Sequence, residues 1–220
     1  MRVQGNLPLS EHLRPKNLGE LAISERYISK MQAMLDEKVP ASMLFFGAPG
    51  TGKTSAARIF CEARGTLGTL EVDGSKDNGI DYIRKVVEGF TTSYALTDGI
   101  KIVFIDDGDY LTAPAQAALR GLIERSSANS RFIMAVNDVT TIDKPIRSRL
   151  LCLHFGIPSA ELPDILKKTQ QRVALCLEEL GWSFDRERLN QIVSDNLSDL
   201  RAMANKLELE FRYRPALCSI

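Results

Sequence analysis

One segment of eight residues constrains the fold of this 220-residue chain more than any other feature. Gly47-Ala48-Pro49-Gly50-Thr51-Gly52-Lys53-Thr54 satisfies the pattern GxxxxGK[ST] in full. The apolar run Met43–Phe46 precedes this segment and predicts a buried strand, and Thr54–Ala63 follows with the pattern of a helix. Because a strand, a glycine-rich turn and a helix in this order form a phosphate-binding loop, the sequence predicts such a loop here.

The residue types of the loop suit a nucleoside triphosphate with its metal. Glycines let backbone N–H groups turn inward and surround phosphate oxygens. Lys53 places a positive charge on the β- and γ-phosphates, and Thr54 offers a hydroxyl to Mg²⁺. The start of the helix adds the positive end of its dipole. We therefore expect ATP and Mg²⁺ as cofactors; the alternative, a glycine-rich turn that carries Lys-Thr by chance, is disfavoured by the flanking strand and helix.

A second motif supplies the acidic residues that such a loop needs. Lys101-Ile102-Val103-Phe104-Ile105-Asp106-Asp107 reads as a buried strand that ends in two carboxylates. Asp106 at the strand end can hold Mg²⁺ through water or together with Thr54. Two carboxylates in an ordinary turn are the alternative, and the complete phosphate loop makes that interpretation the weaker one.

The order of the remaining elements predicts the fold class. Strands that alternate with helices indicate an α/β fold with a parallel sheet. After Gly156-Ile157-Pro158 no further strand pattern follows, so we expect an α/β domain over residues 1–157 and a helical domain over residues 158–220. In the first domain we expect further strands at Thr69–Val72, Ile102–Ile105, Phe132–Val136 and Leu150–Phe155, with helices at Asp81–Phe90 and Ala113–Glu124. In the second we expect helices at Leu162–Leu180, Asp185–Ser194 and Ser198–Tyr213, with Asp185 and Ser198 as N-caps.

Charge and cysteine content exclude several classes of protein. Lys and Arg total 28 and Asp and Glu total 28, so a globally basic nucleic-acid binder is excluded and any DNA contact must come from a local patch. The four cysteines lie far apart and only two histidines occur, which argues against a zinc module or a disulfide framework and for a reducing cytosol. No apolar run approaches a membrane span. We expect a soluble, cytoplasmic protein without a membrane partner.

With both motifs in hand, the chain resembles the AAA+ ATPases and, within them, the clamp-loader small subunits of the replication factor C type. This resemblance implies a P-loop domain with a parallel sheet, followed by a small helical lid. Six further segments carry it in the family's order: Leu13–Leu21, the opening box; Leu70–Asp81, the second-strand stretch; Gln116–Arg120, the QxALR helix; Ala135–Asn137, sensor 1; Ile146–Leu150, the arginine-finger motif; and Asp199–Arg201, sensor 2.

The resemblance implies roles for single residues. Arg14 and Pro15 belong to the segment that lies against the adenine in the family. Asn137 would orient the attacking water or touch the γ-phosphate, and Arg201 would reach that phosphate from the lid. Arg149 would act in trans on ATP held by a neighbouring subunit, since a guanidinium presents a fixed fork to phosphate oxygens. Without the resemblance these residues read as a turn Asn, a solvated helix Arg and a surface Arg; Arg147 competes with Arg149 for the finger role.

The sequence departs from the family at three places. The family usually has Glu after the metal-binding Asp, whereas this chain has Asp107, whose shorter side chain is expected to slow or alter water activation. Leu150 replaces the Cys of the finger motif, while the arginine is kept. The sequence ends at Ile220, where clamp-loader subunits normally continue into a helical collar, so we expect assembly through the AAA+ modules, a partner or a separate chain.

The same resemblance implies partners. In clamp loaders, helix ends track duplex DNA inside a spiral of subunits, and Ile80 and Arg84 would face that DNA here. Lys76 and Lys85 lie nearby in the sequence, and contacts of this kind hold phosphates without reading sequence. We expect a homo- or hetero-oligomer of AAA+ subunits that loads a sliding clamp on primer-template DNA. Two alternatives stay open: a helicase loader or other DNA-remodelling ATPase, and a scaffold subunit that binds nucleotide but hydrolyses it weakly.

Overall fold

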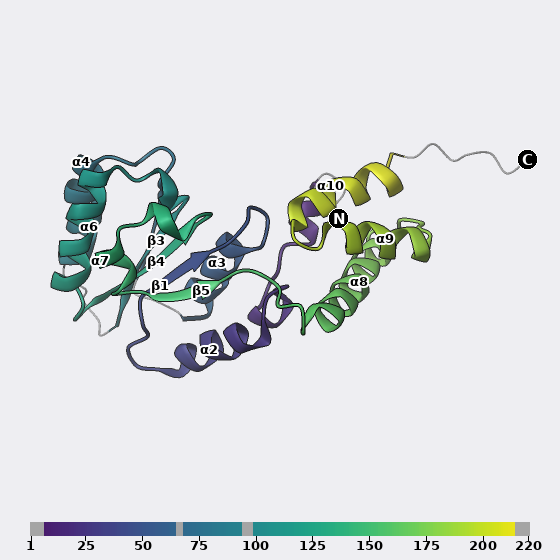
Figure 1. Cartoon of the computed structure of the whole chain (residues 1–220), viewed down its shortest axis with the longest axis horizontal. Helices are drawn as coiled ribbons and strands as arrows, with labels where there is room; N and C mark the ends of the chain where they lie inside the picture. Colours follow the sequence, from purple (N-terminus) through teal and green to yellow (C-terminus); the bar gives the residue numbers. More distant parts are fainter. Residues whose placement is uncertain (1–6, 65–67, 94–98, 214–220) are drawn as a thin grey trace, which may run out of the picture.

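A five-stranded parallel sheet forms the centre of the first domain in the computed structural model, which describes residues 7–64, 68–93 and 99–213. The strand order is β2-β3-β4-β1-β5, so the strand before the phosphate loop lies between β4 and β5 (Figure 1). The strands are β1 (Met43–Phe46), β2 (Thr69–Asp73), β3 (Lys101–Asp106), β4 (Ser130–Val136) and β5 (Leu151–His154). All five were predicted from the sequence to within two residues at each end.

Helices cover both faces of the sheet. Met43 and Phe45 point to one face, which is covered by α2 (Glu25–Asp36) and α3 (Lys53–Arg64). Leu44 points to the opposite face, as expected for side chains that alternate along a strand. That face is covered by the helical segment at residues 80–92, α6 (Ala113–Arg125) and α7 (Lys144–Arg147). Because both faces are buried at the centre of the sheet, β1, β3 and β4 are mostly apolar runs.

Two helical features differ from the sequence-based expectation. Helix α2 was not predicted, although Ile28, Met31 and Met34 form its buried face. The helix predicted at Asp81–Phe90 is present but irregular: α4 (Ile80–Tyr82) and α5 (Glu88–Thr92) flank a π-helical segment, η2 (Ile83–Val87). Such i→i+5 segments are rare and no residue pattern here announces one. Short 3₁₀ turns lie at η1 (Leu18–Glu20), η3 (Gly108–Tyr110) and η4 (Val139–Thr141).

The C-terminal helices form a separate helical lid with its own apolar core (Figure 1). They are α8 (Leu162–Glu179), α9 (Arg186–Asn196) and α10 (Leu200–Phe211). The predicted N-cap of α9 is confirmed, because the Asp185 carboxylate accepts the Arg188 N–H at 2.7 Å. The prediction of Ser198 as the cap of α10 is wrong. Asp199 is the cap, since its carboxylate reaches the N–H groups of Arg201 and Ala202 at 3.1 and 2.9 Å.

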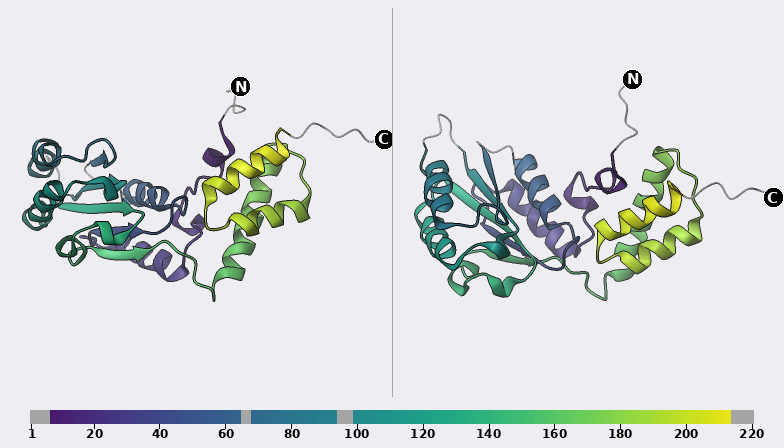
Figure 2. Two further views of the ribbon diagram at one scale, coloured as in Figure 1. Left: turned by 45° about the horizontal axis from the view of Figure 1, so that its top comes forward. Right: turned by 90° about the horizontal axis from the view of Figure 1, so that it is seen from above.

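The N-terminal segment lies on the lid, although it is the first part of the chain that the structure describes. Helix α1 (Leu9–His12) runs beside α10 (Figure 2), and the Leu9 N–H donates to a Glu208 carboxylate oxygen at 3.0 Å. Leu9 and Leu13 are buried in the apolar core of the lid, whereas Leu18 is buried under the sheet. The backbone therefore crosses between the two cores twice, near residues 14–17 and 156–161. The division at residue 157 stays a prediction.

Membrane insertion finds no support in the helices that the structure describes. None of them combines the length and the apolar composition that crossing a bilayer would require.

Candidate functional site

A cavity of about 560 Å³ lies where the phosphate loop, the N-terminal segment and the lid meet. Its polar end is lined by the loop together with Asp106, Asp107 and Asn137 at the ends of β3 and β4. The lid contributes Arg201 from α10. The structure therefore brings together most of the residues predicted for catalysis and for metal and nucleotide binding. Of the loop itself, Pro49, Gly50, Gly52, Lys53 and Thr54 line the cavity.

The loop adopts a conformation that requires glycine and that brings it against the lid. Gly50 and Gly52 have φ angles of 76° and 92°, a region that residues with a Cβ rarely enter. A Cβ at Gly50 would lie 2.0 Å from a carboxylate oxygen of Asp199. The Leu200 N–H donates to the Gly50 carbonyl at 3.0 Å, so the start of α10 rests directly on the loop. This contact places Arg201 at the loop.

Lys53 links the loop to sensor 1. Its buried ammonium donates to the carbonyls of Gly47 and Ala48, both at 2.8 Å, and to the Asn137 side-chain oxygen at 3.0 Å. None of these three acceptors carries a formal charge. Burial lowers the pKa of Lys53, and the nearby carboxylates of Asp109 and Asp106 oppose that effect. A buried cation without a bonded anion is a suitable partner for a phosphate group.

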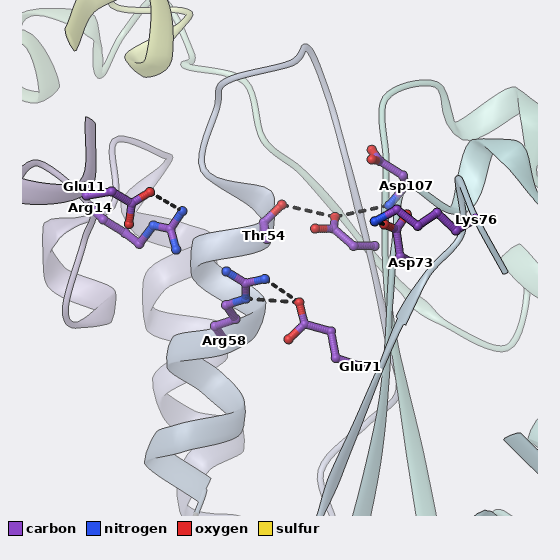
Figure 3. Close-up of polar contacts among 9 residues, drawn as sticks. Glu11, Arg14, Thr54, Arg58, Glu71, Asp73, Lys76 and Asp107 are labelled. Atoms are coloured by element: carbon purple, nitrogen blue, oxygen red, sulfur yellow. Dashed lines mark hydrogen bonds and ion pairs between the residues drawn. The ribbon is translucent and has the colours of Figure 1, made fainter. Parts of the chain in front are cut away.

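Thr54 and Asp106 provide a donor pair that suits Mg²⁺. The Thr54 hydroxyl donates to an Asp106 carboxylate oxygen at 3.1 Å (Figure 3), and the same oxygen accepts the Asp107 N–H at 3.1 Å. Burial raises the pKa of Asp106, because the charged carboxylate is poorly solvated where it lies. A bound cation would stabilise that charged form. A hydroxyl and a desolvated carboxylate are hard oxygen ligands of the kind that Mg²⁺ prefers. The residues present therefore fit the metal.

Asp107 lies next to this pair in an unusual backbone conformation. Its φ and ψ of 50° and 42° make it the one non-glycine residue with positive φ in the described part of the chain. This left-handed conformation carries an energetic cost for a residue with a Cβ. The side chain lines the cavity, as its predicted role in activating water requires.

Asp109 is a component of the site that sequence reasoning missed. Its carboxylate accepts the N–H groups of Asn137 and Asp138 at 2.7 and 2.9 Å and the Thr141 hydroxyl at 3.1 Å. It therefore fixes the turn that carries Asn137. The only sequence signal is its place in Asp106-Asp107-Gly108-Asp109, where it resembles any solvated acid.

The remaining candidates for nucleotide binding lie at the other end of the cavity. Arg14 and Pro15 line that end, and the Arg14 guanidinium pairs with Glu11 at 2.9 Å (Figure 3). On α3, one helical turn after Thr54, Arg58 pairs with Glu71 of β2 and also lines the cavity.

Arg149 is the predicted catalytic residue that the structure does not bring to the loop. It lies between α7 and β5 and is not among the described residues that line the cavity. Its Nε donates to a Glu124 carboxylate oxygen of α6 at 2.6 Å, and its Nη1 bonds to the Pro145 carbonyl. The competing Arg147 differs in that its Nε is buried without a hydrogen-bond partner among the described residues.

The predicted DNA contacts also lie outside the cavity. Ile80 begins α4, and Arg84 and Lys85 are exposed in the π-helical segment. Lys76, which was expected to add charge, pairs with Asp73 at 2.7 Å (Figure 3). Part of the local positive charge is thus neutralised within the chain.

Comparisons with known proteins agree with this geometry. The model of the ATPase family associated with various cellular activities matches residues 43–155, just over half of the chain. The replication factor C small subunit of Staphylothermus marinus is 35% identical over 206 residues, which cover 90% of this chain and 60% of that protein. Human replication factor C subunit 4 is 34% identical over 186 residues, 76% of this chain and 51% of that protein. The chain thus spans at most about 60% of the length of these two relatives.

A solved structure shares the fold. The RuvB Holliday junction branch migration motor of Thermotoga maritima superposes with a TM-score of 0.68, at 20% identity, over 88% of this chain and 63% of that one. At this identity the likeness concerns the sheet and the helical lid alone.

Proposed function

The chain belongs to the ATPase family associated with various cellular activities, and from that premise we propose that it binds and hydrolyses ATP at subunit interfaces of a clamp-loader-like assembly. The single observation that carries the proposal is the hydrogen-bonded set in one cavity. Lys53 bonds to Asn137 and Thr54 bonds to Asp106, which joins the phosphate loop to the ends of β3 and β4. Asp106 was expected in that place from its position at a strand end, and Asn137 from the resemblance to the family.

Within one chain, the proposed roles follow from the positions of the side chains. The loop residues Gly47–Thr54 hold the triphosphate through backbone N–H groups, and Lys53 neutralises its β- and γ-oxygens. Mg²⁺, held by Thr54 and Asp106, supplies charge neutralisation of the phosphate oxygens when it is bound. Asp107 orients the attacking water.

Two groups at the cavity respond to the terminal phosphate. The Asn137 amide already bonds to Lys53, so it lies within reach of the group that Lys53 binds. Arg201 approaches from the lid, whose helix α10 bonds to Gly50. We propose that this contact couples the position of the helical lid, residues 158–220, to the occupancy of the loop in the α/β domain, residues 1–157.

Turnover is proposed to need a second subunit. Arg149 lies away from the cavity of its own chain on a half-exposed surface. A guanidinium supplied by a neighbour is known to stabilise the transition state in nucleotide hydrolases. The proposed neighbour is a second copy of this chain or a related AAA+ subunit.

The clamp-loading role rests on the similarity to proteins named replication factor C subunits. We propose a sliding clamp and primer-template DNA as partners, with Ile80 and Arg84 facing the DNA backbone. The Arg84 guanidinium would bind phosphates without sequence preference, so binding should weaken as salt increases.

Measurement of ATP turnover with and without primed DNA and a sliding clamp tests the proposal. Clamp loading predicts the highest rate when both are present. Turnover that DNA stimulates and the clamp leaves unchanged would favour a helicase loader or another DNA-remodelling ATPase. ATP binding with negligible turnover under every condition would favour the scaffold alternative, for which the short Asp107 side chain is the motivating feature.

A further inference from the structure

The end of the cavity away from the loop has a different chemical character from the phosphate end. Apolar side chains line it, Leu13, Pro15 and Ala22 from the N-terminal segment and Val173 and Met203 from the lid. Polar side chains, among them Arg14, Thr169 and Arg172, line the cavity beside them. An ATP molecule whose triphosphate lies on the loop would place its flat, largely apolar base against this wall. The base is therefore held between two parts of the chain that are far apart in sequence.

One lid arginine joins these two parts. Arg172 on α8 donates from Nη2 to the Leu13 carbonyl at 2.5 Å and from Nη1 to the Glu20 carbonyl at 3.1 Å. Its Nη2 also lies 3.4 Å from a Glu20 carboxylate oxygen. The guanidinium thus binds both ends of the segment 13–20, which we term the strap. Its planar fork can span two acceptors in a fixed geometry, which a lysine ammonium on a flexible stem does not impose.

The position of Arg172 does not serve the phosphate chemistry. Its two backbone partners and its carboxylate partner all belong to the strap. The side chain is 26% exposed and burial lowers its pKa, so it lies in the interface between strap and lid rather than in solvent. Leu13 reinforces that interface because it is buried in the lid core.

We propose that Arg172 is a positioning residue for the nucleotide base: it fixes the curvature of the strap and thereby holds Pro15 and Leu13 as the wall on which the base stacks. This inference rests on the proposed function, because it concerns the same ATP site. Arg172 contributes to the affinity for ATP through the base alone. A ligand that has the three phosphates and no base should not sense its loss.

A competition assay separates the two ends of the cavity. The full chain first binds a fluorescent ATP analogue labelled on the ribose. ATP or inorganic tripolyphosphate is then added to displace it. Arg172→Ala should lower the affinity for ATP about ten-fold, the factor expected for one lost hydrogen bond of a charged group. The affinity for tripolyphosphate should not change. Arg172→Lys keeps the charge but spans one carbonyl, so it should weaken ATP by a smaller factor. It supplies the same test if the alanine variant does not fold.

Two further variants serve as controls. Arg186→Ala removes another lid arginine, whose carboxylate partner is Glu178, and should change neither affinity. Lys53→Ala should weaken both ligands, because both have phosphates.

The outcomes distinguish this inference from the proposed function. The positioning role would be overturned if both Arg172 variants kept the parental ATP affinity. It would also be overturned if they lost affinity for ATP and for tripolyphosphate equally. In either case, weakened binding by Lys53→Ala would still support the ATP site. A Lys53→Ala protein that binds ATP as well as the parent would overturn the site itself.

Discussion

The two positive side chains on which turnover is proposed to depend lie in contrasting surroundings. Lys53 is buried and donates to three acceptors from the loop and from β4. Arg149 is a third exposed and bonds to one carboxylate and one backbone carbonyl outside the cavity. Under the proposed function, nucleotide binding is complete within one chain, whereas hydrolysis requires a group that the chain offers to another.

The contrast extends to how each region is organised. Around Lys53, hydrogen bonds join the start of α3 to Asp106 at the end of β3 and to Asn137 after β4, and Asn137 to Asp109, so these groups are preorganised. The ion pair between Arg149 and Glu124 is a surface pair of the kind that contributes little to stability. A phosphate group can therefore replace Glu124 as the partner of Arg149 at a low cost in free energy.

The strongest test of this comparison concerns hydrolysis and uses Arg149→Ala. Turnover should fall about 10³-fold or more, because a trans arginine contributes that factor in related reactions, while ATP affinity stays at the parental value. Steady-state hydrolysis and equilibrium ATP binding are the measurements. Arg186→Ala, a matched arginine with a carboxylate partner, should leave both unchanged. Full turnover in Arg149→Ala would assign the role elsewhere, with Arg147 the next residue to change.

The claim that one chain binds the nucleotide by itself is tested by Lys53→Ala. Loss of the buried ammonium should weaken ATP binding about 100-fold, as two lost charge-assisted contacts would predict. The exposed Lys38→Ala on the same domain is the control and should bind ATP normally. Calorimetric titration measures the ATP affinity of both variants. A Lys53→Ala protein that binds ATP as tightly as Lys38→Ala would contradict the assignment of the loop.

Asp109→Asn probes the bonds that fix sensor 1. An amide in place of the carboxylate replaces one of the two acceptor oxygens with an NH2 donor, so one of the N–H groups of Asn137 and Asp138 loses its acceptor. The turn should loosen, and kcat should fall about ten-fold with little change in ATP affinity. The effect should vanish in an Asn137→Ala background, because the residue that Asp109 positions is then absent. Additive losses in the double variant would show that Asp109 acts independently of Asn137.

The pH dependence of Mg²⁺ binding should report the burial of Asp106. Burial raises the pKa of this carboxyl group above its ordinary value of 3.8, so the proton competes with the metal at a higher pH than it would at an exposed aspartate. Without metal, the folded state gains stability as pH falls through the raised pKa towards 3.8, while Mg²⁺-dependent stabilisation is lost over the same range. Thermal unfolding with and without Mg²⁺ measures both trends, and Asp106→Asn should flatten them. If the stabilisation by Mg²⁺ stays constant down to the pKa of a free aspartate, burial does not raise the pKa of Asp106.

The smallest expected effect is a gain. Asp107→Glu restores the longer side chain that the family usually has, and turnover should rise a few-fold without a change in ATP affinity, within the range of positioned acid–base groups. Single-turnover measurements of the chemical step are the appropriate assay. An unchanged or lower rate would show that the left-handed backbone at Asp107 already compensates for the shorter side chain.

The sheet and the phosphate loop were predictable because their signals are local. A buried parallel strand is a short apolar run, and β1, β3 and β4 all have that form. The loop motif then fixes the order of strand, turn and helix.

The parts that the sequence did not predict depend on contacts between distant residues. Leu9 is buried against a surface built by the lid, and its N–H bonds to a residue 199 positions later. The partners of Arg172 are backbone carbonyls, which leave no trace in residue type. The cap of α10 was misplaced by one residue because Ser198 and Asp199 are both good caps, and only the position of the first helical turn decides between them.

Mixing two inactive variants tests the central claim most directly. Lys53→Ala is expected to bind ATP only weakly but retains Arg149, and Arg149→Ala is expected to bind ATP but lacks the proposed trans arginine. If hydrolysis takes place between chains, the mixture should recover turnover well above the sum of the two variants, and the recovered rate should rise with protein concentration. Turnover of the mixture that equals the sum at every concentration, together with concentration-independent turnover of the parent, would instead describe an ATPase complete in one chain.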